Sequence, residues 1–305
     1  MNFYHLCILV VPHLPFNARW DSEGVTVLQG LNQPYGFTID QEDNTIFVAD
    51  YENHRIVATV QGNVDGYVVA GGHGQGSALH QLDHPTDVLI DKETHSIIVC
   101  DSGNSRVIRW CLEKGTTQGE VFIDSVMCYG LAMDDKGTLY VTDHENSQLR
   151  RYTRWDATGI TLTMTDDVNG DPFELHFPTY VAVDGDGAVY VSDFNNYRIV
   201  KWSEETKHGA IVTGDGQIEN DSASRLVPMG LVVDSTNTVY VVDVQKHLIA
   251  RWKKGVNRSE IVLGKYGNGN KVNQLNGPID LSFDNHGNLF VCDMLNNRIL
   301  RFSIV

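Results

Sequence analysis

The stretch Val48-Ala49-Asp50-Tyr51-Glu52-Asn53-His54-Arg55-Ile56-Val57 sets the pattern of the whole chain. An apolar run ends in an Asp, a polar turn follows, and a basic residue opens a second apolar run. The pattern returns five times, and its Asp stands at positions 50, 101, 143, 193, 243 and 293, so the intervals are 51, 42, 50, 50 and 50 residues. Six copies at a nearly fixed period indicate a repeat architecture.

Each copy reads as four short strands. The first is an apolar run without alternation, which is typical of a strand covered on both faces; these runs lie at 36–39, 88–90, 131–133, 181–183, 231–233 and 281–283. A polar turn leads to a β-branched second strand that ends in the repeat Asp. The third strand runs from the Arg position to an aromatic residue, and a Gly-bearing turn leads to the fourth. Six such units predict an all-β fold, a six-bladed β-propeller.

The two ends of the chain fit a closed ring. Residues 301–305 form the third strand of the sixth copy, with no fourth strand after it. Near the N-terminus, residues 25–28 look like a fourth strand with no first or second strand before it. We therefore predict that this N-terminal strand completes the last blade, which removes an exposed sheet edge. The predicted division is a lead segment, 1–18, and a single propeller, 19–305.

Three recurring signatures resemble NHL repeats. They are a Pro-x-Gly start such as Pro34-Tyr35-Gly36, a strand such as Tyr190-Val191-Ser192-Asp193, and a turn such as Asn53-His54-Arg55-Ile56. The resemblance covers residues 19–305 and implies a six-bladed propeller. It also implies protein or RNA recognition, including substrate recognition in tripartite-motif ubiquitin ligases. Related propellers are enzymes, among them peptidyl-hydroxyglycine lyase and lactonases.

Charge and composition narrow the partners. The formal net charge of −16 disfavours nucleic acid, because affinity for phosphate backbones depends on Lys and Arg. No apolar run approaches the length of a membrane span, and we expect a monomeric propeller. Cys100 and Cys292 occupy the same small-residue position before the repeat Asp, which predicts buried free thiols. Neither a secreted nor a cytosolic location follows from the sequence.

The repeated Asp and Arg are predicted to build the blades. An Asp that closes a strand can accept hydrogen bonds from the backbone of the turn, and the Arg can pair with that carboxylate. A residue repeated around a ring suits a structural role, whereas a catalytic site needs unlike residues in one place. The predicted turn residues are Asp50, Arg55, Asp101, Arg106, Asp143, Asp193, Arg198, Asp243, Asp293 and Arg298.

The unlike residues lie beside these turns. The second residue after the Pro position is Gly in three copies, and Asp87, Tyr180 and Asp280 in the others. With their neighbours they predict a mixed acidic and aromatic channel mouth, the usual place for a ligand or partner. The predicted mouth set is Tyr35, Asp87, Tyr129, Tyr180, Met229 and Asp280. No cofactor is predicted, although Asp87 and Asp280 offer the carboxylate oxygens that a divalent cation takes in a channel.

Histidines give little support for catalysis. His80 and His84 have a spacing found in zinc sites, but no further ligand is placed by a motif, which favours a solvated loop. His54 and His247 hold equivalent repeat positions and read as surface repetition. We therefore expect a non-catalytic module that recognises a protein or peptide through the propeller face. The alternatives are a metal-dependent enzyme of the lyase or lactonase kind, and the recognition part of a tripartite-motif-like ubiquitin ligase.

Overall fold

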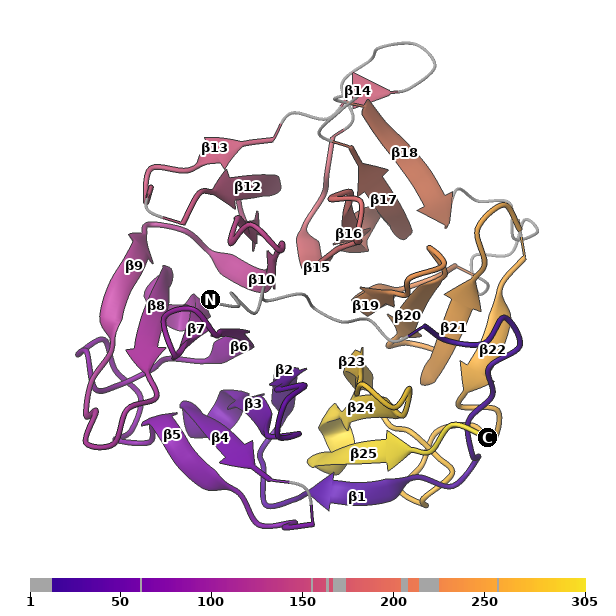
Figure 1. Cartoon of the computed structure of the whole chain (residues 1–305), viewed down its shortest axis with the longest axis horizontal. Coiled ribbons are helices and arrows are strands. Elements are labelled where there is room, and N and C mark those ends of the chain that lie inside the picture. The colour runs from indigo at the N-terminus through magenta and orange to yellow at the C-terminus, as the bar shows by residue number, and fades with distance from the viewer. Residues whose placement is uncertain are drawn as a thin grey trace, which may run out of the picture.

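The computed structural model describes residues 13–60, 62–154, 156–162, 165–166, 174–203, 208–213, 225–256 and 258–305. Its strands form six small sheets arranged radially around a central channel (Figure 1). The predicted six-bladed β-propeller is therefore confirmed. In each blade the first strand lies innermost, and the four strands of the repeat pair antiparallel with their neighbours.

The first three blades follow one another along the chain. Blade 1 contains β2 (Pro34–Ile39), β3 (Ile46–Asp50), β4 (Arg55–Thr59) and β5 (Tyr67–Gly71). Blade 2 contains β6 (Pro85–Asp91), β7 (Ser96–Asp101), β8 (Arg106–Cys111) and β9 (Glu120–Asp124). Blade 3 contains β10 (Cys128–Met133), β11 (Leu139–Asp143), β12 (Gln148–Tyr152) and the short β13 (Ile160–Thr161). Only three residues separate β9 from β10, which accounts for the 42-residue interval.

The remaining blades depart from this plan in two places. Blade 4 contains β15 (Pro178–Val183), β16 (Val189–Asp193), β17 (Arg198–Trp202) and β18 (His208–Thr213), with β14 (Thr165–Asp166) added parallel to β18. Blade 5 contains β19 (Pro228–Val233), β20 (Val239–Asp243), β21 (Leu248–Trp252) and β22 (Glu260–Leu263). Blade 6 contains β23 (Pro278–Phe283), β24 (Leu289–Asp293), β25 (Arg298–Phe302) and β1 (Val25–Leu28). The sequence did not predict β14.

The ring closes between the two ends of the chain, as predicted. Strand β1 pairs antiparallel with β25, with Val25 opposite Arg301 and Thr26 opposite Leu300. A further bridge joins Trp20 to Ile304. The last blade is thus assembled from both ends of the sequence, and the outer edge of β25 is covered (Figure 1).

The innermost strands begin two or three residues earlier than the sequence predicted. Each starts at the Pro position, and a register shift follows at once, for example between Pro34 and Phe37. Proline lacks the N–H group needed for a regular ladder, which explains why the apolar run alone marked only the later part of the strand. The strands beside them are fully buried; all five residues of β3 are buried.

The segment before the first blade packs against blades 5 and 6. Leu14 and Ala18 are buried, and the Trp20 indole donates a hydrogen bond to the Gly287 carbonyl at 2.8 Å. Arg251 donates to the Ala18 carbonyl. Residues 13–18 of the predicted lead segment therefore contact the propeller, and residues 1–12 lie outside the described part of the chain.

A disulfide joins blades 2 and 3. Cys100 of β7 is bonded to Cys128, the first residue of β10, and their Cα atoms are 5.4 Å apart. The prediction of a free thiol at Cys100 is therefore wrong, whereas Cys292 is free and buried as predicted. Cys292, at the same position of blade 6, faces the first residue of the next blade, Pro34. Only at Cys128 does that first residue replace the Pro of the other blades.

The described helices are single 3-10 turns: η1 (Tyr51–Asn53), η2 (Ser102–Asn104), η3 (Phe194–Asn196) and η5 (Met294–Asn296). Each follows a repeat Asp and ends in a residue with left-handed backbone, such as His54 at φ 51°. Within the described residues, no helix is long and apolar enough to cross a membrane.

Candidate functional site

Strand direction gives the propeller two distinct faces. The starts of the innermost strands and the turns after the repeat Asp lie on one face, which we call the Pro face. The turns between first and second strands, such as residues 40–45, lie on the other, the hairpin face. Contacts across the Pro face confirm that these two sets of loops meet, because the backbone N–H of Asn32 donates to Asp50 at 2.7 Å.

The repeat Asp side chains hold the Pro face together from inside. Asp50 is fully buried and accepts hydrogen bonds from the Arg55 guanidinium at 2.7 Å and the Asn53 amide at 2.8 Å. The same Arg pairing recurs at 2.7 Å in blades 2, 4 and 6. Where the Arg is missing, Arg150 and Lys246 supply the positive charge, at 3.9 and 3.4 Å from their Asp. This is the arrangement that a blade-building role requires.

The residue that ends each turn joins one blade to the next. His54 Nδ1 accepts the backbone N–H of His84 at 3.1 Å, and His247 Nδ1 accepts that of Gly277 at 2.9 Å. Asn297 Oδ1 likewise accepts the backbone N–H of Gln33 at 2.8 Å. His54 and His247 are therefore part-buried joints between blades, and the prediction of simple surface repetition is wrong. The one-dimensional pattern could not show which loop each turn contacts.

Small and large residues alternate at one level of the channel. The third residue of the innermost strand, or its equivalent, is Gly36, Asp87, Gly130, Tyr180, Gly230 and Asp280 in turn. A Cβ atom added to Gly36 would lie 2.2 Å from the Asp87 carboxylate, and one added to Gly230 would lie 2.4 Å from that of Asp280. At Gly130 it would meet the backbone of Thr179 and Tyr180. Each glycine thus makes room for the large residue of the following blade.

The two channel carboxylates are buried and bound to backbone. Asp87 accepts the N–H groups of Val88 and Leu131, both at 2.8 Å. Asp280 accepts those of Leu281 at 2.8 Å and Phe37 at 3.0 Å. Burial raises the pKa of Asp87 to about 7. Burial and the nearby Asp87 raise the pKa of Asp280 well above its usual range.

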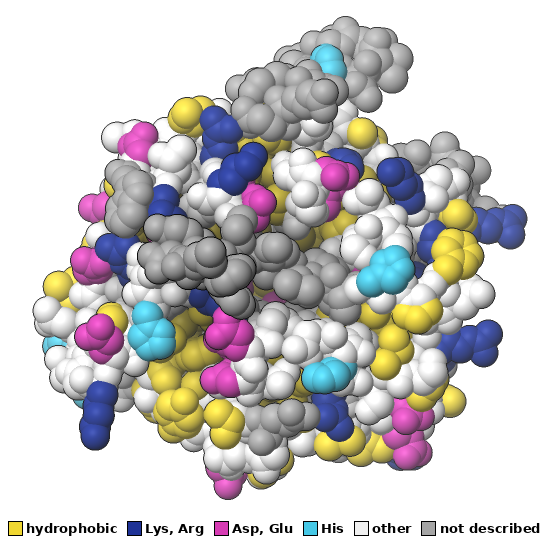
Figure 2. Space-filling model, in the orientation of Figure 1, with side chains coloured by type: hydrophobic (Ala, Val, Ile, Leu, Met, Phe, Trp, Pro, Cys, Tyr) yellow, Lys and Arg dark blue, Asp and Glu magenta, His cyan; other side chains and the backbone are white. Residues whose placement is uncertain are grey.

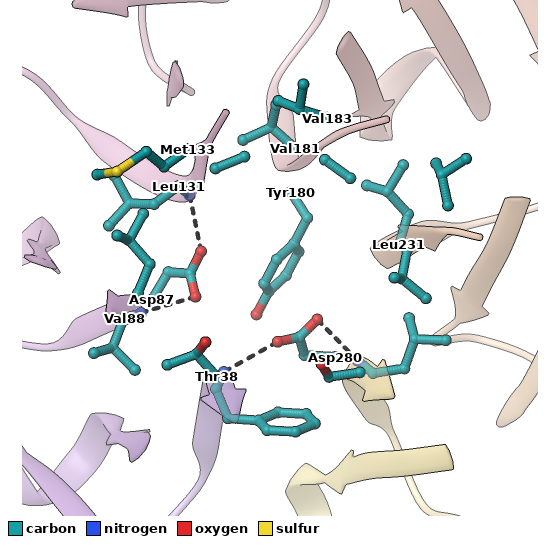
Figure 3. Close-up of a pocket in the computed structure, with 18 of the residues that line it drawn as sticks. Thr38, Asp87, Val88, Leu131, Met133, Tyr180, Val181, Val183, Leu231 and Asp280 are labelled. Atoms are coloured by element: carbon teal, nitrogen blue, oxygen red, sulfur yellow. Dashed lines mark hydrogen bonds between the residues drawn. The ribbon is translucent and has the colours of Figure 1, made fainter. Parts of the chain in front are cut away.

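Tyr180 lies between these carboxylates. Its side chain is 4% exposed, and its hydroxyl is buried without a hydrogen-bond partner. Figure 3 shows the hydroxyl directed toward the space between Asp87 and Asp280. Burial raises the pKa of Tyr180 well above its usual value, so the hydroxyl stays neutral at physiological pH. Three oxygen-bearing side chains from blades 2, 4 and 6 therefore converge in the channel.

A cavity of about 140 Å³ extends from these three residues along the channel. Its lining follows the innermost strands to their ends, including Met133, Val183 and Val233, so it lies in the half toward the hairpin face. Tyr35, Tyr129 and Met229 do not line it. The predicted mouth set therefore divides: Asp87, Tyr180 and Asp280 line the cavity, while the other three lie toward the Pro face.

An arc of aromatic rings crosses the Pro face from blade 1 to blade 4. Tyr35 stacks on Tyr51 with centroids 4.3 Å apart, and Tyr129 lies 6.1 Å from Tyr35. The arc continues to His144 and Phe177, at 5.5 and 4.9 Å between successive rings. We call the set formed with two further rings the aromatic arc: His54, His84, Tyr51, Tyr35, Tyr129, His144 and Phe177. Of this set, the predicted mouth contained only Tyr35 and Tyr129, whereas His54 and His84 were assigned to the surface and to a solvated loop.

One cluster has the composition of a metal site. Ligand atoms of His54, Asp83 and His84 lie within 4.8 Å of one another beside Tyr51. His84 Nδ1 is 2.6 Å and His54 Nδ1 is 3.8 Å from the Asp83 carboxylate. His84 thus pairs with blade 1, and the suggested partner His80 instead contacts His73. The solvated loop expected for His84 is therefore not what the structure shows.

Figure 2 shows basic side chains dispersed among acidic and uncharged ones on the face that it draws. A sequence-tolerant nucleic-acid site needs a continuous basic groove with stacking aromatics.

Comparison with known proteins agrees with the fold. The NHL repeat model matches residues 31–58 and 175–202, which lie mainly in blades 1 and 4. These stretches are NHL repeats. The match is consistent with the NHL-repeat β-propeller family, as the sequence signatures predicted. No curated protein sequence matches this chain.

Several solved structures are similar to this propeller. A Bacteroides thetaiotaomicron protein of unknown function has a TM-score of 0.69 and 14% identity, over 94% of this chain and 73% of the other. An auxiliary nutrient-binding protein from the same organism has a TM-score of 0.64 and 16% identity, over 97% and 75%. Virginiamycin B lyase from Staphylococcus aureus has a TM-score of 0.57 and 12% identity, over 94% and 100%. At these identities the likeness concerns the fold alone.

Proposed function

We propose that this NHL-repeat propeller is a non-catalytic binding module that recognises a protein or peptide through its Pro face. The observation that carries the proposal is the aromatic arc. Aromatic residues are enriched at recognition surfaces, because they give a large contact area and lose little conformational entropy on binding. The net charge of −16 would favour encounter with a positively charged partner.

The arc is confined to one sector of the Pro face. At the position after the repeat Asp, the arc residues Tyr51 and His144 stand in blades 1 and 3, and Phe194 stands in blade 4. Ser102, Val244 and Met294 stand there in blades 2, 5 and 6. The propeller fold itself therefore does not require rings there. The sector is also conformationally costly, since Phe177 has φ 57°, a backbone region that bulky residues seldom adopt.

The test is selection of peptide ligands on the intact protein. Peptides chosen from a random displayed library against the wild-type chain should lose about ten-fold or more in affinity with Tyr51→Ala, because truncating a central aromatic typically costs at least 1–2 kcal/mol. A matched control is Tyr266→Ala, since Tyr266 is 58% exposed and lies outside the arc. Ligands that bind both variants as tightly as the wild type would refute the proposal. The same face would serve substrate recognition if the module works in a ubiquitin ligase.

A second candidate is a metal-dependent enzyme, and the cluster of His54, Asp83 and His84 favours it. Catalytic zinc commonly has three protein ligands and an open position. Against this, His54 Nδ1 already accepts the His84 backbone N–H. Elemental analysis of protein purified without chelators separates the candidates. Near-stoichiometric zinc that is lost in His84→Ala would favour the enzyme. Wild-type protein that does not retain zinc would exclude the metal-dependent enzyme.

A further inference from the structure

The channel cavity has one polar end and an otherwise largely aliphatic wall. Asp87, Tyr180 and Asp280 form its polar end, and aliphatic side chains supply most of the rest of the wall, among them Val88, Leu131, Val181, Val183 and Leu231 (Figure 3). None of the described residues that line it is Lys, Arg or His. Two buried carboxylates thus share a cavity without a cationic side chain. A buried carboxylate is costly unless a counter-charge or hydrogen bonds compensate it.

The polar end has capacity for a ligand with three donors. Each carboxylate oxygen accepts one backbone N–H and retains a further lone pair. The Tyr180 hydroxyl is buried and has no partner. An ammonium group carries three N–H donors and one positive charge, so it matches three converging oxygens. A hard divalent cation takes six to eight oxygen ligands, which this largely aliphatic wall does not offer.

We propose that the channel cavity binds the primary ammonium group of a small alkylamine, with the nitrogen between Asp87, Tyr180 and Asp280 and the alkyl chain against the aliphatic wall. The volume fits, because a cavity of about 150 Å³ accepts a ligand the size of benzene. The site is separate from the aromatic arc, so it stands or falls independently of peptide recognition on the Pro face.

The test uses n-pentylammonium and two analogues on the full chain. Titration followed by calorimetry or NMR should give one saturable site for n-pentylammonium. The neutral 1-pentanol lacks the charge, and pentyltrimethylammonium keeps the charge but has no N–H donor. Each should bind about ten-fold more weakly or worse, because it lacks either the positive charge or the N–H donors of the charge-assisted hydrogen bonds to the channel oxygens.

Variants locate the binding within the channel. Tyr180→Phe keeps the ring and removes only the unpartnered hydroxyl, and Asp280→Asn replaces one carboxyl group by a neutral amide; each should weaken n-pentylammonium binding about ten-fold. The matched control is Asp284→Asn, because Asp284 is equally buried and accepts backbone N–H groups outside the cavity. It should leave the affinity unchanged, which excludes general attraction to an acidic protein.

Several results would overturn the proposal. These are absence of saturable n-pentylammonium binding, equal affinity for n-pentylammonium and 1-pentanol, and unchanged affinity in folded Tyr180→Phe protein. Tight binding of Ca²⁺ or Mg²⁺ that n-pentylammonium does not displace would also overturn it and assign the carboxylates to a metal ion. Thermal melting of each variant checks that the propeller is intact.

Discussion

Two boundaries between blades share the same pair of residues but form different bonds. Asp87 lies opposite Cys100 where blade 2 meets blade 3, and Asp280 lies opposite Cys292 where blade 6 meets blade 1. Both carboxylates accept a backbone N–H of the next blade. Yet Cys100 forms a disulfide with Cys128, whereas the Cys292 thiol donates to the Pro34 carbonyl at 3.2 Å.

The two cysteines form different bonds because a different residue faces each of them. Cys128 and Pro34 hold the same position, the first residue of the next blade. The same boundary position is filled by hydroxyls elsewhere, since Thr142 donates to the Thr179 carbonyl and Ser192 to the Met229 carbonyl. The comparison teaches that a Cys, Ser or Thr before the repeat Asp is a connector whose bond depends on the blade that follows.

Removing the disulfide should have the largest effect on stability. The double variant Cys100→Ala and Cys128→Ala should lower the free energy of unfolding by about 3 kcal/mol, because the bond closes a loop of 28 residues in sequence separation. Denaturant unfolding with and without reductant measures it. Cys292→Ala is the control: it keeps the disulfide, so its stability, like that of the wild type, should fall in reductant, whereas that of the double variant should not. Equal responses of the two proteins to reductant would contradict the disulfide.

Truncating the carboxylates tests whether the two boundaries are otherwise equivalent. Asp87→Ala leaves the Leu131 N–H without its acceptor, and Asp280→Ala does the same to Phe37. Each substitution should lower the free energy of unfolding by about 1–3 kcal/mol. Because only the first boundary is covalently linked, hydrogen exchange should accelerate more at Phe37 than at Leu131. Faster exchange at Leu131 would show that the disulfide does not hold its boundary locally.

Filling the glycine spaces tests the close packing beside each carboxylate. Gly36→Ala and Gly230→Ala place a methyl group against Asp87 and Asp280 and should destabilise the protein by about 1–2 kcal/mol through overpacking. Gly185→Ala is the control, since nothing lies within 4 Å of its added Cβ. Thermal melting compares the three. A stable Gly36→Ala protein would show that Asp87 moves away easily.

The smallest expected effect is on pH dependence. Burial raises the pKa of Asp87 to about 7, so its contribution to stability is fully present below the unfolded-state value near 4 and is lost as the pH rises through 7. Asp280, Tyr129 and Tyr180 are the titratable groups facing it across the channel. Between pH 6 and 8 the wild type should lose about 1 kcal/mol that Asp87→Asn does not lose. Parallel stability curves for both proteins would contradict this.

Much of the architecture follows from the sequence because repeats make it redundant. The spacing of Asp50 and its five equivalents predicts the blades, and the incomplete ends predict the pairing of β1 with β25. The disulfide also had a signal in the repeat: Cys128 interrupts the Pro series directly after the blade that carries Cys100. The pairing becomes visible only when the Cys residues of neighbouring repeats are compared.

The candidate sites could be predicted less completely from the sequence, because they depend on contacts between repeats. Asp87, Tyr180 and Asp280 were singled out as exceptions to glycine, and the structure brings them together. Their separation from Tyr35, Tyr129 and Met229 depends on depth along the channel, which a linear pattern does not encode. The aromatic arc joins a turn of one blade to the loop of the next, as His54 and His84 show.

The alternation of glycine with Asp or Tyr around the channel has a consequence for how the ring can change. A closed circle can alternate two kinds of member only if their number is even. Losing or gaining a single blade would set two glycines or two bulky residues side by side, leaving either a gap or a clash at the axis. The unit that can be added or removed while keeping this channel is therefore a pair of blades, although the repeat visible in the sequence is one.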